Sequence, residues 1–173
     1  MKVNIGKYPK KGDQKINVRI DPWDTWSMDH TLAHIITPML KQLQATKHGS
    51  PMVDDEDVPE KIRSTKAKKK KHEWDTDSNV HKRWDYVLGE MIFAFESMTT
   101  DWEDQFYSGN VDFNCVPVDA KGKKVDKKDA KFFEMKKGPK DTFKVNQKGM
   151  DKYEARMQNG IRLFAKYYRG LWD

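Results

Sequence analysis

With 173 residues, the chain is long enough for one domain of ordinary size, and we expect a single domain over residues 1–173. Hydrophobic residues make up 36% of the chain and charged residues 35%, which predicts a polar surface around a modest core. The chain has no apolar run near the roughly 18 residues of a membrane span and no apolar stretch of signal-peptide type at its start. We therefore expect a cytoplasmic protein without a membrane partner, in keeping with its single cysteine, Cys115.

The formal charge of +6 arises from 33 Lys and Arg against 27 Asp and Glu. Such a basic balance attracts nucleic acid, nucleotides or anionic lipid. Five of the lysines are concentrated in residues 66–71. Because this cluster contains no aromatic side chain, a solvated loop is favoured over a binding surface.

The first part of the chain predicts one short strand and one helix. Residues 1–14 are rich in Lys, Gly and Pro, and we expect them to form a loose arm. The alternation of apolar and polar residues over 16–20 predicts a strand. Ser27 is in position to cap a helix that Pro38 should kink. The predicted apolar face of this helix consists of Met28, Leu32, Ile35, Ile36, Met39, Leu40 and Leu43.

Residues 48–72 predict a long charged loop. Four acids at 54–57 precede the lysine cluster at 66–71. A loop of this length in a compact domain is usually functional or mobile. The acidic run could bind a cation, but it lacks the spaced ligands and the glycine of a calcium loop. A solvated acidic run is therefore favoured.

The segment Glu73–Trp102 is expected to form the central core helix. Asp75, Thr76 and Asp77 are candidate caps, and apolar residues then recur with helical period at Trp84, Val87, Leu88, Met91, Ile92 and Phe95. Short strands are predicted over 111–118, 132–135 and 142–145, and a last helix should follow Gly149. The predicted fold class is α+β, with three main helices packed with a small, mostly antiparallel sheet of three or four short strands.

Two histidines, His30 and His34, are four residues apart and therefore share one face of the first helix. This spacing can hold a metal ion, with a third ligand from His72, His81, Glu73, Asp75 or Asp77. No HExxH or CxxC motif supports such a site. The favoured alternative is that both rings hydrogen-bond across a partly polar helix interface, and we predict neither a metal ion nor a cofactor.

Aromatic residues beside polar ones suggest a ligand pocket. Trp and Tyr rings stack on bases, and Arg and Lys hold phosphates. We expect the pocket where the start of the central helix meets the first helix and the aromatic C-terminus, although aromatics at helical spacing also suit a core. Ten residues are the predicted ligand contacts: Trp23, Trp26, His30, His34, Trp74, His81, Arg83, Trp84, Tyr168 and Arg169.

Four stretches of the chain, residues 19–43, 47–59, 74–109 and 156–173, resemble a widespread family of small accessory proteins of tailed bacteriophages. The resemblance covers nearly the whole chain and brings no assigned catalytic residues. It implies an accessory protein that works in the cytoplasm of an infected bacterium.

Three functions follow as hypotheses. The first is a protein that binds a phosphorylated nucleotide-type ligand and sequesters a host immune signal, such as a cyclic dinucleotide or an ADP-ribose derivative. By analogy with proteins of that kind it would form a homo-oligomer, and it would need no turnover. The alternative is a protein that binds nucleic acid or a host protein through its basic loop. The third is a metal-dependent hydrolase that uses His30, His34 and nearby acids.

Overall fold

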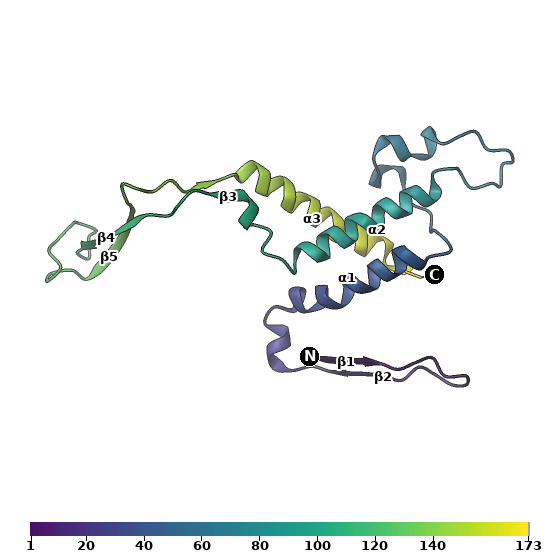
Figure 1. Ribbon diagram of the computed structural model, residues 1–173, viewed down its shortest axis with the longest axis horizontal. Helices are drawn as coiled ribbons and strands as arrows, with labels where there is room; N and C mark the ends of the chain where they lie inside the picture. The colour runs from purple at the N-terminus through teal and green to yellow at the C-terminus, as the bar shows by residue number, and fades with distance from the viewer. Residues whose placement is uncertain (173) are drawn as a thin grey trace. The chain divides into compact units, whose positions relative to one another are not determined.

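The computed structural model describes residues 1–172 and falls into two compact units (Figure 1). One unit consists of residues 1–101 and the chain from Ala155 onward, and the other is Trp102–Glu154. The predicted α+β class with three main helices is confirmed. The strands, however, pair into three separate two-stranded antiparallel ribbons, β1–β2, β3–β6 and β4–β5.

The first unit contains two strands, α1, α2 and most of α3. Its elements are β1 (Lys2–Ile5), β2 (Ile16–Arg19), the short 3₁₀ helix η1 (Pro22–Thr25), α1 (Met28–Thr46), η2 (Asp55–Asp57), η3 (Glu60–Ile62), η4 (Ser64–Lys66), α2 (Val80–Ser97), α3 (Gln147–Tyr167, of which the part from Ala155 belongs here) and η6 (Tyr168–Gly170).

The second unit contains the other four strands and the first turns of α3. Its remaining elements are η5 (Asp104–Phe106), β3 (Tyr107–Ser108), β4 (Phe113–Val118), β5 (Phe132–Lys137) and β6 (Lys144–Val145). Stacked rings of Trp102 and Tyr153, with centroids 5.0 Å apart, join the two ends of this unit.

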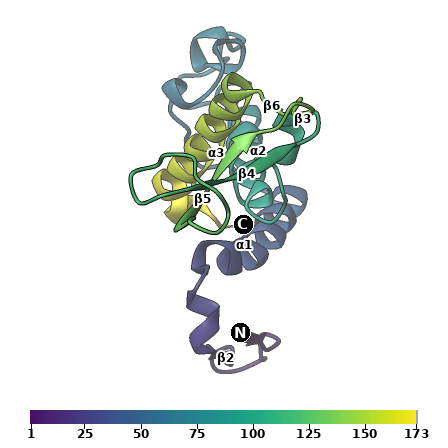
Figure 2. The same cartoon turned by 90° about the vertical axis from the view of Figure 1, so that its left-hand side faces the viewer.

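The core of the first unit lies around α2, beside α1 and the C-terminal part of α3 (Figure 2). Eleven residues of α2 are buried, and the side chains of Trp84 and Leu88 are inaccessible to solvent. At Gly160 of α3 a Cβ atom would lie 2.3 Å from the carbonyl oxygen of Glu90, so only glycine permits this approach of the two helices. The helix-period stripe predicted for the central segment is therefore the core face, as expected.

Three local expectations differ from the structure. The arm over 1–14 contains β1, because Val3 and Ile5 alternate in register with Val18 and Ile16 of β2. The loop over 48–72 has three short 3₁₀ helices, and it contributes side chains to the core: Val53, Val58 and, partly buried, Ile62. The acidic run over 54–57 is not fully solvated, since Asp57 is buried.

Candidate functional site

An apolar depression lies between α1 and the end of the described chain, and we call it the α1 groove. It has a volume of about 770 Å³. Its lining comes from one face of α1 and from α3 and the residues that follow it: Leu32, Ile36, Met39, Leu40, Leu43, Phe164, Tyr168, Leu171 and Trp172. Among residues 1–172, no charged side chain lines this groove.

The groove exists because α1 carries a wider apolar stripe than α2 and α3 can cover. Of the seven residues of the predicted apolar face of the first helix, only Leu40 is buried, and Ala33 is the other buried residue of α1. Met39 remains 61% exposed, and Trp172 at the other wall remains 65% exposed. Clefts lined mostly by apolar and aromatic side chains are the usual form of binding sites.

The predicted contacts Trp23 and Trp26 form a surface pair in and just after η1. Their ring centroids are 6.1 Å apart, and both rings are largely exposed. Trp74 is also exposed and stacks on His72 at a centroid distance of 4.8 Å. His81 shares a hydrogen bond of 2.9 Å with Ser50. These aromatic residues are accessible to a ligand, but they do not line the α1 groove.

His30 and His34 contact one another, as their spacing predicted. The two Nε2 atoms are 3.0 Å apart, and Nδ1 of His30 is 3.0 Å from the carbonyl oxygen of Met98 in the loop after α2. Since a carbonyl only accepts, Nδ1 of a neutral His30 donates to Met98, and Nε2 of His34 donates to Nε2 of His30. This chain of hydrogen bonds joins α1 to the end of α2.

Arg83 and Trp84, predicted as ligand contacts, are both buried. Only 1% of Arg83 is exposed. Its guanidinium donates to both carboxylate oxygens of Asp77, at 2.9 and 2.6 Å. These hydrogen bonds lower the pKa of Asp77 and raise that of Arg83. The charge of Arg83 is therefore already paired with the carboxylate of Asp77. Trp84 lies on the apolar stripe of α2 and belongs to the core.

Of the ten predicted contacts, Tyr168 is the one that lines the α1 groove. Arg169 follows it and forms no hydrogen bond or ion pair with another described residue. A surface ion pair with Asp173 is the alternative to a ligand contact of Arg169, and Asp173 lies outside the described residues. The structure therefore does not bring the ten residues into one pocket.

A second depression of about 610 Å³, which we call the lysine pocket, lies over the loop that precedes α2. It includes Lys68, Lys69 and Lys70 and reaches the buried Arg83. The other lining residues are Met52, Val53, Asp54, Asp55, Ser64, Thr65, Ala67 and Asp77. The lysine cluster, expected as a solvated loop, thus forms one wall of a pocket.

The acidic run contains a buried polar network that the sequence analysis missed. Asp57 accepts hydrogen bonds of 2.6 Å from Arg162 and from the hydroxyl of Tyr167, and it forms an ion pair of 2.6 Å with Lys166. Burial alone would raise the pKa of Asp57, but these donors together hold it below its ordinary value. The Tyr167 hydroxyl also accepts from the backbone N–H of Asp54 at 3.0 Å, and burial raises its pKa to about 12.

This network has the arrangement of a cation site whose cation is a lysine. Within residues 1–172, Asp54, Glu56 and Asp57 form the one group of three or more metal-ligating side chains. The ammonium of Lys166 lies 2.8, 3.0 and 2.6 Å from their carboxylates. One feature of the sequence indicates that this acidic run is partly buried: the apolar residues Val53 and Val58 lie on either side of the acids.

No family model, curated protein or solved structure matches this chain. Among the described residues, no helix combines the length and the apolar character needed to cross a bilayer.

Proposed function

We propose that this chain is a binding protein that takes an amphipathic helix of a partner protein into the α1 groove. The observation that carries this proposal is the uncharged, apolar lining of the groove. If the resemblance to phage accessory proteins holds, the partner is a host protein. The proposal corresponds to the protein-binding alternative of the sequence analysis, with the groove in place of the basic loop.

The dimensions of the groove suit a helix. Its wall on α1 runs from Leu32 to Leu43, a rise of about 16 Å or three helical turns. A partner helix of that length presents anchors at positions i, i+4 and i+7. The rim of the groove carries Tyr168 and Trp172, residue types that dominate the binding energy of many protein interfaces.

The same lining argues against a nucleotide in the α1 groove. A phosphate needs cationic or backbone donors. In the part of the lining that the structure describes, the polar side-chain groups are limited to the Tyr168 hydroxyl and the Trp172 indole N–H. A buried phosphate without partners would be strongly disfavoured.

The test uses a photo-cross-linking amino acid at Tyr168 in the full chain, expressed in bacterial cells. The matched control is the same group at Gln42, which lies on α1 and does not line the groove. We expect one partner protein to be captured from Tyr168 and not from Gln42. A Met39→Asp substitution should reduce that capture about tenfold, because it places an unpaired carboxylate in the interface.

Two outcomes would contradict the proposal. Equal capture from Tyr168 and Gln42 would show that the groove is not the contact surface. Capture of this chain alone would show that the groove joins copies of the protein. Since Met39 is largely exposed, the Met39→Asp variant should keep the melting temperature of the wild type, and this is measured alongside.

A phosphorylated nucleotide-type ligand is a second candidate, and the lysine pocket supports it. The three carboxylates of this pocket already have partners: Asp54 pairs with Lys166, Asp55 accepts from Ser64 at 2.5 Å, and Asp77 accepts from Arg83. Within the described chain, Lys68, Lys69 and Lys70 form no ion pair. Their charges are therefore available to an anion such as a cyclic dinucleotide or an ADP-ribose derivative.

Calorimetry against a panel of such compounds tests this second candidate. Combined alanine substitution of Lys68, Lys69 and Lys70 should weaken binding at least tenfold. The matched control removes the same charge from the exposed Lys7, Lys10 and Lys11 and should leave binding unchanged. Failure of every compound to bind the wild type would remove this candidate and would leave the groove proposal untouched.

A further inference from the structure

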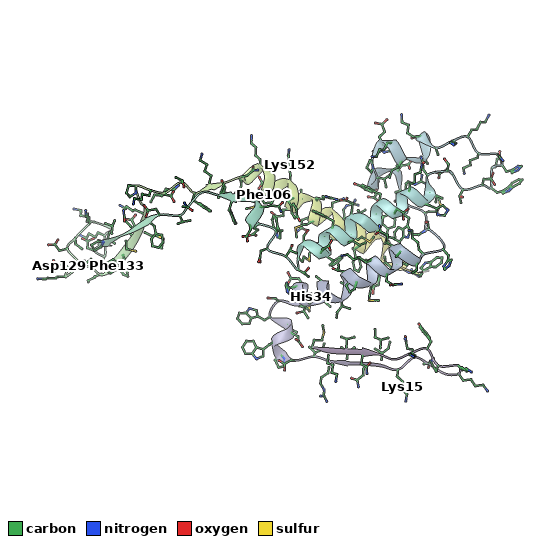
Figure 3. All side chains as sticks on the ribbon, in the orientation of Figure 1. Lys15, His34, Phe106, Asp129, Phe133 and Lys152 are labelled. Carbon is green, nitrogen blue, oxygen red and sulfur yellow. The ribbon has the colours of Figure 1, made fainter. Side chains whose placement is uncertain are left out.

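The β4–β5 ribbon presents an apolar face on an isolated pair of strands. The register pairs Phe113 with Lys137, Cys115 with Met135, and Pro117 with Phe133. Residues paired across a ribbon, and those two apart along a strand, point to the same face. Phe113, Cys115, Pro117, Phe133 and Met135 therefore share one face, which we call the ribbon face. Figure 3 labels Phe133 on β5 and Asp129 in the loop at the end of the ribbon.

The ribbon face is uncovered. Phe133 is 57% exposed, and Phe113 and Met135 are exposed as well. Within the second unit, no other element buries these three side chains. A two-stranded ribbon gains little stability from an apolar face that remains in water, so these side chains contribute little to folding. Their placement is explained by an occupant from outside the chain.

The loop that closes the ribbon is cationic and has unpaired charges. Residues 119–131 contain six lysines against three aspartates, and all six lysines are exposed. None of the six forms an ion pair with another described residue. One of the aspartates, Asp119, accepts hydrogen bonds from the backbone N–H groups of Lys121 and Lys123 and so shapes the turn. The occupant of the ribbon face therefore has to be strongly negative beside this loop.

We propose that the β4–β5 ribbon binds single-stranded nucleic acid. Bases stack on Phe133 and Phe113 of the ribbon face, while the lysines of residues 119–131 contact the phosphates. Charge complementarity selects this occupant. A second copy of the ribbon would bring two cationic loops together, and an apolar protein helix would leave six ammonium groups without anions. This surface is separate from residues 66–71 and does not depend on the α1 groove.

The test measures the binding of the full chain to a labelled oligothymidylate of about 15 nucleotides, by fluorescence anisotropy over a range of salt concentrations. Phe133→Ser should weaken binding about tenfold. The matched control is Phe132→Ser. Phe132 is 62% exposed but lies on the opposite face of the same strand, so this variant should bind like the wild type.

A charge variant gives the second measurement. Combined alanine substitution at Lys121, Lys123 and Lys124 should weaken binding and make the affinity less dependent on salt. The slope of log affinity against log salt should fall by about 0.7 for each phosphate that is no longer neutralised. The control with the same charge change, at the exposed Lys7, Lys10 and Lys11, should keep both the affinity and the slope. An abasic oligonucleotide of equal length should bind more weakly than the oligothymidylate, because it offers no base to stack.

The proposal is overturned if the wild type does not bind the oligothymidylate, or if Phe132→Ser and Phe133→Ser weaken binding equally. It is also overturned if the abasic strand binds as tightly as the oligothymidylate. Binding to phosphatidylglycerol vesicles in preference to the oligonucleotide would overturn it too, and would identify a lipid surface as the occupant.

Discussion

The central helix α2 and the β4–β5 ribbon both carry apolar side chains at regular spacing, yet they are buried to opposite extents. In α2, eleven of 18 residues are buried, whereas Val118 is the only buried residue of the two ribbon strands. The helix is held by side-chain packing. The ribbon is held mainly by the hydrogen bonds of its backbone. An apolar pattern alone therefore does not distinguish a residue that stabilises the fold from one that serves a partner.

The charges of the two regions differ in the same way. Arg83 of α2 is paired with Asp77, and Glu90 of α2 accepts from Arg156 at 2.7 and 2.9 Å. The lysines of residues 119–131 have no carboxylate partner within the described chain. Charges that are neutralised internally support folding, and charges that are not remain available for binding.

The largest expected loss of stability is at Trp84, in the buried face of α2. Trp84→Ala should lower the free energy of unfolding by about 3–5 kcal/mol, because it leaves a large cavity in the core. Phe133→Ala in the ribbon should cost less than about 0.5 kcal/mol. Urea denaturation of both variants measures the two effects. A similar loss in both would mean that the ribbon face is covered in the folded protein.

The next largest loss of stability is expected when the buried ion pair of Arg83 and Asp77 is broken. Asp77→Ala should cost about 3 kcal/mol, because it leaves the guanidinium of Arg83 buried without its anion. The double variant with Arg83→Met should recover much of this loss, since it removes the unpaired charge. Urea denaturation again gives the free energies of unfolding. If the double variant is no more stable than Asp77→Ala, the pair contributes through packing and not through its charges.

The smallest expected effect is the contribution of Asp57 to the pH dependence of the free energy of unfolding. Its pKa is lowered on folding, so its ion pairs add full stability above the unfolded pKa of about 4 and lose it as the pH falls through the folded pKa. Asp57→Asn should be about 2 kcal/mol less stable than the wild type at pH 7. This difference, measured by urea denaturation at each pH, should shrink as the pH falls below about 4. A difference that stays constant with pH would show that the carboxylate charge is not responsible.

The sequence by itself determined the secondary structure where a local period repeats. The apolar stripe of residues 84–95 predicted α2, and the alternation over 16–20 and 111–118 predicted β2 and β4. The short, mostly apolar run over 132–135 predicted β5. Ser27 marked the start of α1, although the predicted caps at 75–77 lie before the true start of α2. These predictions succeed because helix and strand periods arise from contacts between residues close in the chain.

Only the tertiary structure decided which of these faces are covered. The apolar face of the first helix was predicted from its period, and the structure leaves much of that face open as the α1 groove. Arg83 was predicted to meet a ligand and instead meets Asp77, and Asp57 meets Arg162, a residue 105 positions away. Burial and pairing depend on which elements pack together, and a local period does not contain that information.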